Sequence, residues 1–141
     1  KNVRPDLKLK TDRWYHVAMV YEGDSLTLYV DGKPEGQLST KSSMKRKVNG
    51  LPFIVGADPD ARGRANSFFN GEIDEIRISK GARYSKPFEP KRRLASDQDT
   101  VIFLDCDQVV GPFLIDRGPQ GHYFRLTGDA CLTEVKEEAN Q

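Results

Sequence analysis

Cysteine is scarce in this chain, and its scarcity excludes the scaffolds that depend on this residue. Cys106 and Cys131 are too few for a disulfide framework, and neither has the Cys-x-x-Cys or His spacing that would hold zinc. Both lie in short strand-like segments near the C-terminus. Two interpretations stay open: one bridge closing a loop of about 25 residues, which would add about 3 kcal/mol in the chain-entropy model, or two unpaired thiols.

The chain also lacks a dominant charge and a long apolar run. Its 22 basic and 21 acidic residues leave a net charge of +1, so the chain as a whole does not attract nucleic acid or an anionic membrane surface. No apolar stretch approaches the roughly 18 residues of a membrane span. We therefore predict no nucleic-acid partner and no membrane insertion.

The sequence begins at Lys1 without a signal segment, so we expect it to be a piece of a longer protein.

Helical periodicity is absent too, whereas short strand-like segments recur about every ten residues. Residues 14–21 are apolar on both faces, as in a strand buried between two layers. Residues 25–30 alternate between apolar and polar after a turn that contains Gly23. The Asp31-Gly32 dipeptide favours a tight hairpin turn, and Pro34 marks residues 33–39 as an edge strand.

Further strands complete an all-β pattern. They are predicted at residues 51–56, 68–79, 100–107, 122–126 and 130–135, with a long rim loop at 57–67. A chain of 141 residues can bury one hydrophobic core, so we predict a single domain at residues 1–133, followed by a polar tail at 134–141. The predicted fold class is an antiparallel jelly-roll β-sandwich.

Three motifs, in order along the chain, resemble one family of β-sandwich domains. They are RWYHVAMVYEGDSLTLYVDGK at 13–33, FNGEIDEIRIS at 69–79 and GARYSKPFEPKRRLASDQDTVIFL at 81–104. Together they are similar to bacterial laminin-G-like (LamG) domains of the concanavalin A-like lectin/glucanase superfamily. The resemblance implies strands ahead of Trp14 that this chain lacks, and hence an N-terminally incomplete domain with an unpaired edge. After residue 104 only isolated positions match, among them Asp116, Gly121 and His122.

Three carboxylates, Glu72, Asp74 and Glu75, stand in a segment otherwise typical of a strand. Laminarinase-type glucanases of the same superfamily carry Glu-x-Asp followed by a second Glu as acid/base, but Ile76 and Arg77 occupy its positions here. Glu75 would point to the opposite face of a regular strand. We therefore predict that the protein is not an enzyme. The parity of the flanking apolar residues predicts a bulge near Asp74 and Glu75, where Glu75 would pair with Arg77.

Oxygen ligands suited to calcium lie in and beside the predicted rim loop. The resemblance implies one Ca²⁺ ion at the sheet rim, and the available ligands are Asp58, Asp60, Asn70 and Asp74. The alternative interpretation is that these side chains are simply solvated at the rim.

Four further groups have both a functional and a structural interpretation. Arg62 and Arg64, with Tyr84 on the next connection, are typical of a sugar or peptide contact, or else are ordinary loop residues. The basic residues of 41–47 form a solvated loop or a patch for an acidic glycan. We expect His16 to pack in the core and His122 to be a loop residue without a catalytic partner.

These observations favour a non-catalytic recognition module that binds a glycan or a protein through its rim loops. The resemblance implies a larger secreted, periplasmic or cell-surface protein around it. The alternative is a structural or assembly domain whose N-terminal strand edge pairs with a second copy or a complementing segment. A glucanase relative without its acid/base is the third interpretation.

Overall fold

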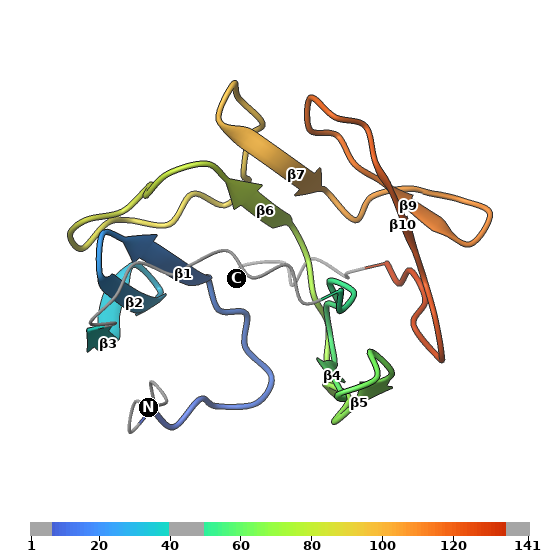
Figure 1. Ribbon diagram of the computed structural model, residues 1–141, viewed down its shortest axis with the longest axis horizontal. Coiled ribbons are helices and arrows are strands. Elements are labelled where there is room, and N and C mark those ends of the chain that lie inside the picture. The colour runs from blue at the N-terminus through green and yellow to red at the C-terminus, as the bar shows by residue number, and fades with distance from the viewer. Residues whose placement is uncertain (1–6, 40–49, 135–141) are drawn as a thin grey trace, which may run out of the picture. The chain divides into compact units, whose positions relative to one another are not determined.

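The computed structural model describes residues 7–39 and 50–134, in which ten β-strands and no helix are found (Figure 1). All strand pairs are antiparallel, which confirms the predicted all-β class. No helix in this described part is long and apolar enough to cross a membrane. The basic segment 41–47 and all but the first residue of the predicted tail lie outside the described residues. Two compact units are present, Lys1–Ile73 with Gly81–Arg92 and Asp74–Lys80 with Arg93–Gln141.

The first unit contains a three-stranded sheet built from local sequence signals. Its strands are β1 (Val17–Glu22), β2 (Ser25–Val30) and β3 (Lys33–Ser39), in the order β1-β2-β3. In the first turn Gly23 has φ 61°, and in the second Asp31 and Gly32 have φ 48° and 74°. Two successive positive values are what a two-residue type I′ turn requires. The turns and the strands predicted at 25–30 and 33–39 are therefore confirmed.

Aromatic side chains cover one face of this sheet. Tyr29 on β2 is only 4% exposed, and its ring centroid lies 5.7 Å from that of Phe88 and 6.2 Å from that of Tyr84. The rings of Tyr84 and Phe88 stack 3.5 Å apart, and His16 meets both edge-on. Phe88 N also donates to Gly32 O at 3.0 Å, which ties this cluster to the second turn. His16 is thus packed among aromatic rings, as expected.

The opposite face of the sheet is exposed along β1. Val17 and Met19 are 59% and 71% exposed, and Trp14, just ahead of the strand, is 49% exposed. Val20, which alternates to the aromatic face, is buried. The prediction that residues 14–21 are buried on both faces is wrong, because among the described residues of this unit only one face of β1 is covered. Within the described sheet, β1 pairs with β2 alone.

The rim region, residues 50–73, has less strand than predicted. No strand forms at 51–56, where Pro52 cannot donate a backbone hydrogen bond and Phe53 is 55% exposed. The predicted long loop is folded into a short hairpin of β4 (Asp58–Pro59) and β5 (Ala65–Asn66). Residues 68–75 are not a strand, so the segment predicted at 68–79 is paired only from residue 76 onward.

The second unit begins with an antiparallel pair of strands. The pair consists of β6 (Ile76–Ser79) and β7 (Thr100–Leu104). Glu75, immediately before β6, has φ 49°, so the backbone changes direction where the parity of the apolar residues predicted. Phe103 and Leu104 on β7 are buried and supply the core of this unit. The strand predicted at 100–107 is confirmed in its first five residues.

A second three-stranded sheet follows in this unit. Its strands are β8 (Val109–Val110), β9 (Phe113–Ile115) and β10 (Tyr123–Arg125), in the order β10-β9-β8. The strand predicted at 122–126 corresponds to β10. The pairing of β8 with β9 was not predicted, because strands of two and three residues carry no readable alternation. No strand is formed in the described residues 130–134, so the strand predicted at 130–135 is wrong for that part.

Candidate functional site

The tip of the β4–β5 hairpin is held by one carboxylate. Asp60 Oδ1 accepts hydrogen bonds from Arg62 N at 2.8 Å and from Arg64 N at 2.9 Å. Its Oδ2 accepts from Arg64 Nε at 2.8 Å, which makes an ion pair. These bonds, those from the backbone and side chain of Arg64 foremost, lower the pKa of Asp60 below its ordinary value. Both oxygens of Asp60 therefore serve the loop itself.

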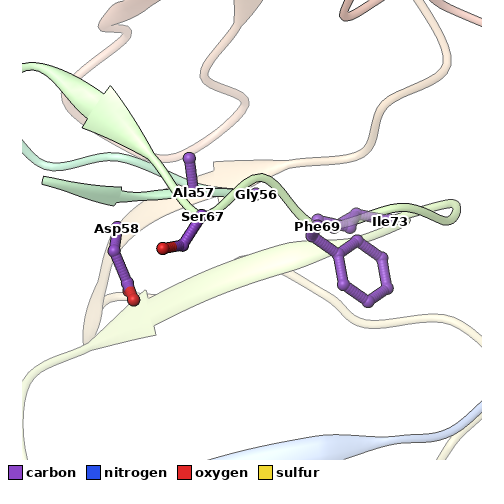
Figure 2. A pocket seen from close by; sticks show the side chains of 6 residues that line it. All are labelled: Gly56, Ala57, Asp58, Ser67, Phe69 and Ile73. Atoms are coloured by element: carbon purple, nitrogen blue, oxygen red, sulfur yellow. The ribbon is translucent and has the colours of Figure 1, made fainter.

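A pocket of about 370 Å³ opens beside this hairpin. Its lining residues are Gly56, Ala57, Asp58, Ser67, Phe69 and Ile73, all shown in Figure 2. We call it the Asp58 pocket. In Figure 2, the Asp58 carboxylate and the Ser67 hydroxyl lie toward one end, and Phe69 and Ile73 lie toward the other. The pocket is thus polar at one end, apolar at the other and open to solvent.

Backbone geometry positions the walls of the Asp58 pocket. Gly56 and Ser67, one on each side of the hairpin, have φ 81° and 49°. The Phe69 amide donates to Gly56 O at 2.8 Å, so the two flanking segments are tied together. Ser67 is not glycine, and a non-glycine residue held in the left-handed region stores about 1–3 kcal/mol of strain that is common at binding sites. The left-handed backbone at Ser67 and the hydrogen bond between Phe69 and Gly56 together hold the walls of the pocket.

The charge of the pocket is not compensated within the described chain. Asp58 is exposed, and no described residue makes a hydrogen bond or an ion pair with its carboxylate. Its neighbour on the hairpin, Asp60, is neutralised by Arg64. Ser67 Oγ donates to Asn66 Oδ1 at 2.9 Å and keeps its own lone pairs as acceptors. The two side chains at the polar end of the pocket therefore offer only acceptors, one of them negatively charged.

The four predicted calcium ligands differ in their surroundings. Asp58, Asp60 and Asn70 belong to the first unit, and Asp74 belongs to the second. Asp60 already accepts three hydrogen bonds, and Asp74 Oδ1 accepts one from Glu75 N at 2.9 Å. In residues 7–39 and 50–134 no three His, Cys, Asp or Glu side chains gather in a metal-binding group. Calcium binding stays a prediction from the family resemblance.

The predicted contact of two arginines with Tyr84 has a different context in the structure. Arg64 is engaged by Asp60, and Arg62 lies at the exposed hairpin tip. Tyr84 is half-buried, with its ring stacked on Phe88 in the aromatic cluster of the sheet. One face of the Tyr84 ring is thus already occupied by Phe88.

The carboxylates compared with glucanases lie around the start of β6. Glu75 accepts hydrogen bonds from Leu94 N at 2.8 Å and from Arg93 Nη1 at 3.3 Å, and Arg77 donates to Ala95 O. Burial, more than repulsion from Glu75, raises the pKa of Asp74 above its ordinary value. Glu75 therefore fastens residues 93–94 to the start of β6, which is a structural role.

The two cysteines are free thiols in this structure. Cys106 is half-buried with φ 57°, and burial, aided by the neighbouring carboxylates, raises the pKa of its thiol. Cys131 is exposed. A raised pKa makes Cys106 a poor nucleophile at neutral pH. The disulfide remains one of the two interpretations of the sequence.

Asp116 and His122 form a pair that the sequence reading did not connect. The buried Asp116 carboxylate accepts from Phe103 N at 2.8 Å, Gly118 N at 2.7 Å and His122 N at 3.2 Å. His122 Nδ1 lies 2.9 Å from Asp116 Oδ2 and donates to it, since an ionised carboxylate only accepts. Burial alone would raise the pKa of Asp116, but these hydrogen bonds together lower it. Both residues match positions of the laminin-G-like family, and this match was the signal in the sequence that could have pointed to them.

The fold consists of antiparallel strands, and an open pocket lies beside a rim hairpin. These features define a class of all-β domain rather than a particular protein. Residues 1–86 match the laminin G family model described as the concanavalin A-like lectin/glucanases superfamily. This match covers 86 of the 141 residues, so the chain belongs to that family, and the fold class of a concanavalin A-like β-sandwich is confirmed. No curated protein and no solved structure matches the chain.

Proposed function

We propose that this protein is a non-catalytic recognition module that binds a glycan or a protein through its rim loops. The supporting observation is the Asp58 pocket, which combines an unpaired carboxylate with an exposed aromatic ring beside the β4–β5 hairpin. Binding sites commonly pair apolar walls with a few placed polar groups. As the resemblance implies, we place the module within a larger secreted, periplasmic or cell-surface protein.

A binding assay with pocket variants tests this proposal. The pure protein is applied to a glycan array and used to isolate proteins from the extracellular fraction of its source. The double variant Asp58→Asn/Phe69→Ala removes both ends of the pocket and should abolish what the wild type retains. The matched control Glu35→Gln removes an exposed carboxylate of β3 in the same unit and should change nothing. Retention of every ligand by the double variant would contradict a role for this rim.

The absence of catalysis is part of the proposal. Ile76 and Arg77 stand at the positions of the second carboxyl that a retaining glucanase needs at about 5 Å from its nucleophile. Glu75, the nearest further carboxylate along the chain, is engaged by Arg93 and Leu94. A carboxylate fastened in this way is a poor proton shuttle. We therefore expect binding without turnover.

A second candidate function is assembly through β1. This strand pairs with β2 alone among the described residues, and it exposes Val17 and Met19. A strand edge with free backbone groups beside apolar side chains can add a strand from a second copy or from a complementing segment. Multi-angle light scattering after size exclusion measures this directly.

A matched pair of variants makes the assembly test specific. Val17→Lys places a charge on the free edge, and Val110→Lys places one on β8 at almost the same exposure, 58% against 59%. Only Val17→Lys should convert a dimer into a monomer. A wild type that stays monomeric at high concentration would contradict assembly through this edge without affecting the recognition proposal.

A further inference from the structure

The two ends of the Asp58 pocket have different chemistry. Phe69 is 58% exposed, and Ile73 is 41% exposed, so the apolar end presents carbon surface to an incoming group. The side chains of Asp58 and Ser67 present only acceptors at the other end. A ligand that satisfies both ends has an apolar stem and a terminal hydrogen-bond donor.

The position of the Phe69 ring is set by a residue without a side chain. A Cβ at Gly71 would lie 2.8 Å from both Cε1 and Cζ of Phe69, which is closer than real contacts allow. The ring therefore rests against the Gly71 backbone. It forms a platform at the apolar end of the pocket.

The negative charge of Asp58 restricts the class of ligand that the pocket can bind. The carboxylate of Asp58 has no ion pair among the described residues, whereas the adjacent Asp60 is neutralised by Arg64. A negative charge next to an aromatic ring favours a cation, because the ring face and the carboxylate both attract positive charge. An anionic sulfated or uronic-acid glycan would be repelled, and a neutral sugar would leave the charge of Asp58 unmatched.

Resting on the recognition function proposed above, we infer that the Asp58 pocket receives a lysine or arginine side chain of a protein partner. The methylene stem lies along Phe69 and Ile73, and the charged head reaches the Asp58 carboxylate and the Ser67 hydroxyl. Long cationic side chains have this apolar stem and polar tip. Exposed apolar side chains adjacent in sequence, Phe68 at 70% and Val55 at 41%, extend the surface available to the partner.

The inference can be tested with four small probes on the whole chain by ¹⁵N-HSQC titration in EDTA, so that no calcium occupies Asp58. The probes are the N-acetyl methylamides of lysine, arginine and norleucine, and methyl glucoside. Norleucine has the lysine stem without the charge, so it isolates the contribution of Asp58. We expect the lysine and arginine derivatives to shift the amides of Gly56, Asp58, Ser67 and Phe69, and to bind about fivefold more tightly than norleucine.

Variants separate charge from shape in the same titration. Asp58→Asn should weaken lysine binding about fivefold, to the level of norleucine, and Asp58→Glu should keep most of it. Gly71→Ala displaces the platform and should weaken lysine and norleucine alike. Raising NaCl from about 50 mM to 500 mM should weaken binding of the lysine and arginine derivatives but not of norleucine, because salt screens exposed charges. The folded state of each variant is checked by its own HSQC dispersion.

The opposite results would overturn the inference. Equal binding of lysine and norleucine, or lysine binding that Asp58→Asn leaves unchanged, excludes charge recognition here. Methyl glucoside shifting the four amides while lysine does not would make this a sugar site, which removes this inference and keeps the recognition function. If no probe shifts these amides, the inference fails by itself, and the glycan array and protein isolation still decide the broader proposal.

Discussion

Gly32→Ala should be one of the most destabilising alanine substitutions in the first unit. A Cβ at Gly32 would lie 1.7 Å from Phe88 O and 2.8 Å from Phe88 C, both backbone atoms. Ordinary C···O contacts are about 3.3 Å or longer, so the two segments must separate by roughly 1.5 Å. The φ of 74° adds the strain of a left-handed alanine.

The magnitude follows from the contacts that this separation breaks. The left-handed alanine costs about 1–2 kcal/mol. The hydrogen bond from Phe88 N to Gly32 O, 3.0 Å long, contributes about 1 kcal/mol. Loosening Phe88 from Tyr84 and Tyr29 costs roughly another 1 kcal/mol of aromatic contact. We expect Gly32→Ala to lower the free energy of unfolding by about 3–4 kcal/mol.

Gly23→Ala is the matched control for backbone strain. Gly23 stands in the neighbouring turn with φ 61°, and a Cβ there meets no atom within 4 Å. Gly23→Ala should lower the free energy of unfolding only by the strain of an alanine in the left-handed region, about 1–2 kcal/mol. Urea unfolding followed by the fluorescence of Trp14, the single tryptophan, measures both variants. Equal losses in the two variants would refute the reasoning, because the close approach to Phe88 would then carry no energy.

Three further predictions concern the second unit, calcium and catalysis. Asp116, whose pKa is lowered in the folded state, stabilises the fold above about pH 4, and this contribution disappears as the pH falls through its folded pKa. Asp116→Asn should therefore be less stable than wild type at pH 7 and should lose less stability between pH 5 and pH 3. Urea unfolding at each pH measures this, and an equal loss of stability in the two proteins would contradict it. If Ca²⁺ binds, a concentration of 100 times its Kd should add about 2.7 kcal/mol to the free energy of unfolding. Asp58→Asn should reduce this gain. A melting temperature that EDTA leaves unchanged would argue against the site. Pure protein should release no reducing ends from laminarin, and release that Glu72→Gln abolishes would show a glucanase.

Local chemistry explains why the β1-β2-β3 sheet was predictable. Period-two alternation at residues 25–30 and the Asp31-Gly32 dipeptide act between near neighbours, and both appear in the structure with the expected turn geometry. The family motifs lie in the same region, and the family match at residues 1–86 includes it. The parity break before β6 is local too. It predicted a bulge near Asp74 and Glu75, and the backbone does turn there, with Glu75 in the left-handed region, but no strand is paired before residue 76.

Strand predictions failed where pairing depends on distant partners. Residues 51–56 are apolar enough for a strand, but no described strand pairs with them, and Phe53 is left 55% exposed. Residues 14–21 suggested burial on both faces, because composition records how apolar a face is and not what covers it. In the structure Val17 and Met19 are exposed.

The sequence by itself determined the fold class, the first sheet and the residue types available at the rim. Only the tertiary structure decided how those residues are used. Asp58 and Asp60 look equivalent in the sequence, yet the turn of the hairpin brings Arg64 onto Asp60 and leaves Asp58 beside Phe69. Asp116 likewise takes a hydrogen bond from Phe103 N, 13 residues away. Hydrogen bonds form only when donor and acceptor lie about 3 Å apart, so they depend on how the chain folds back.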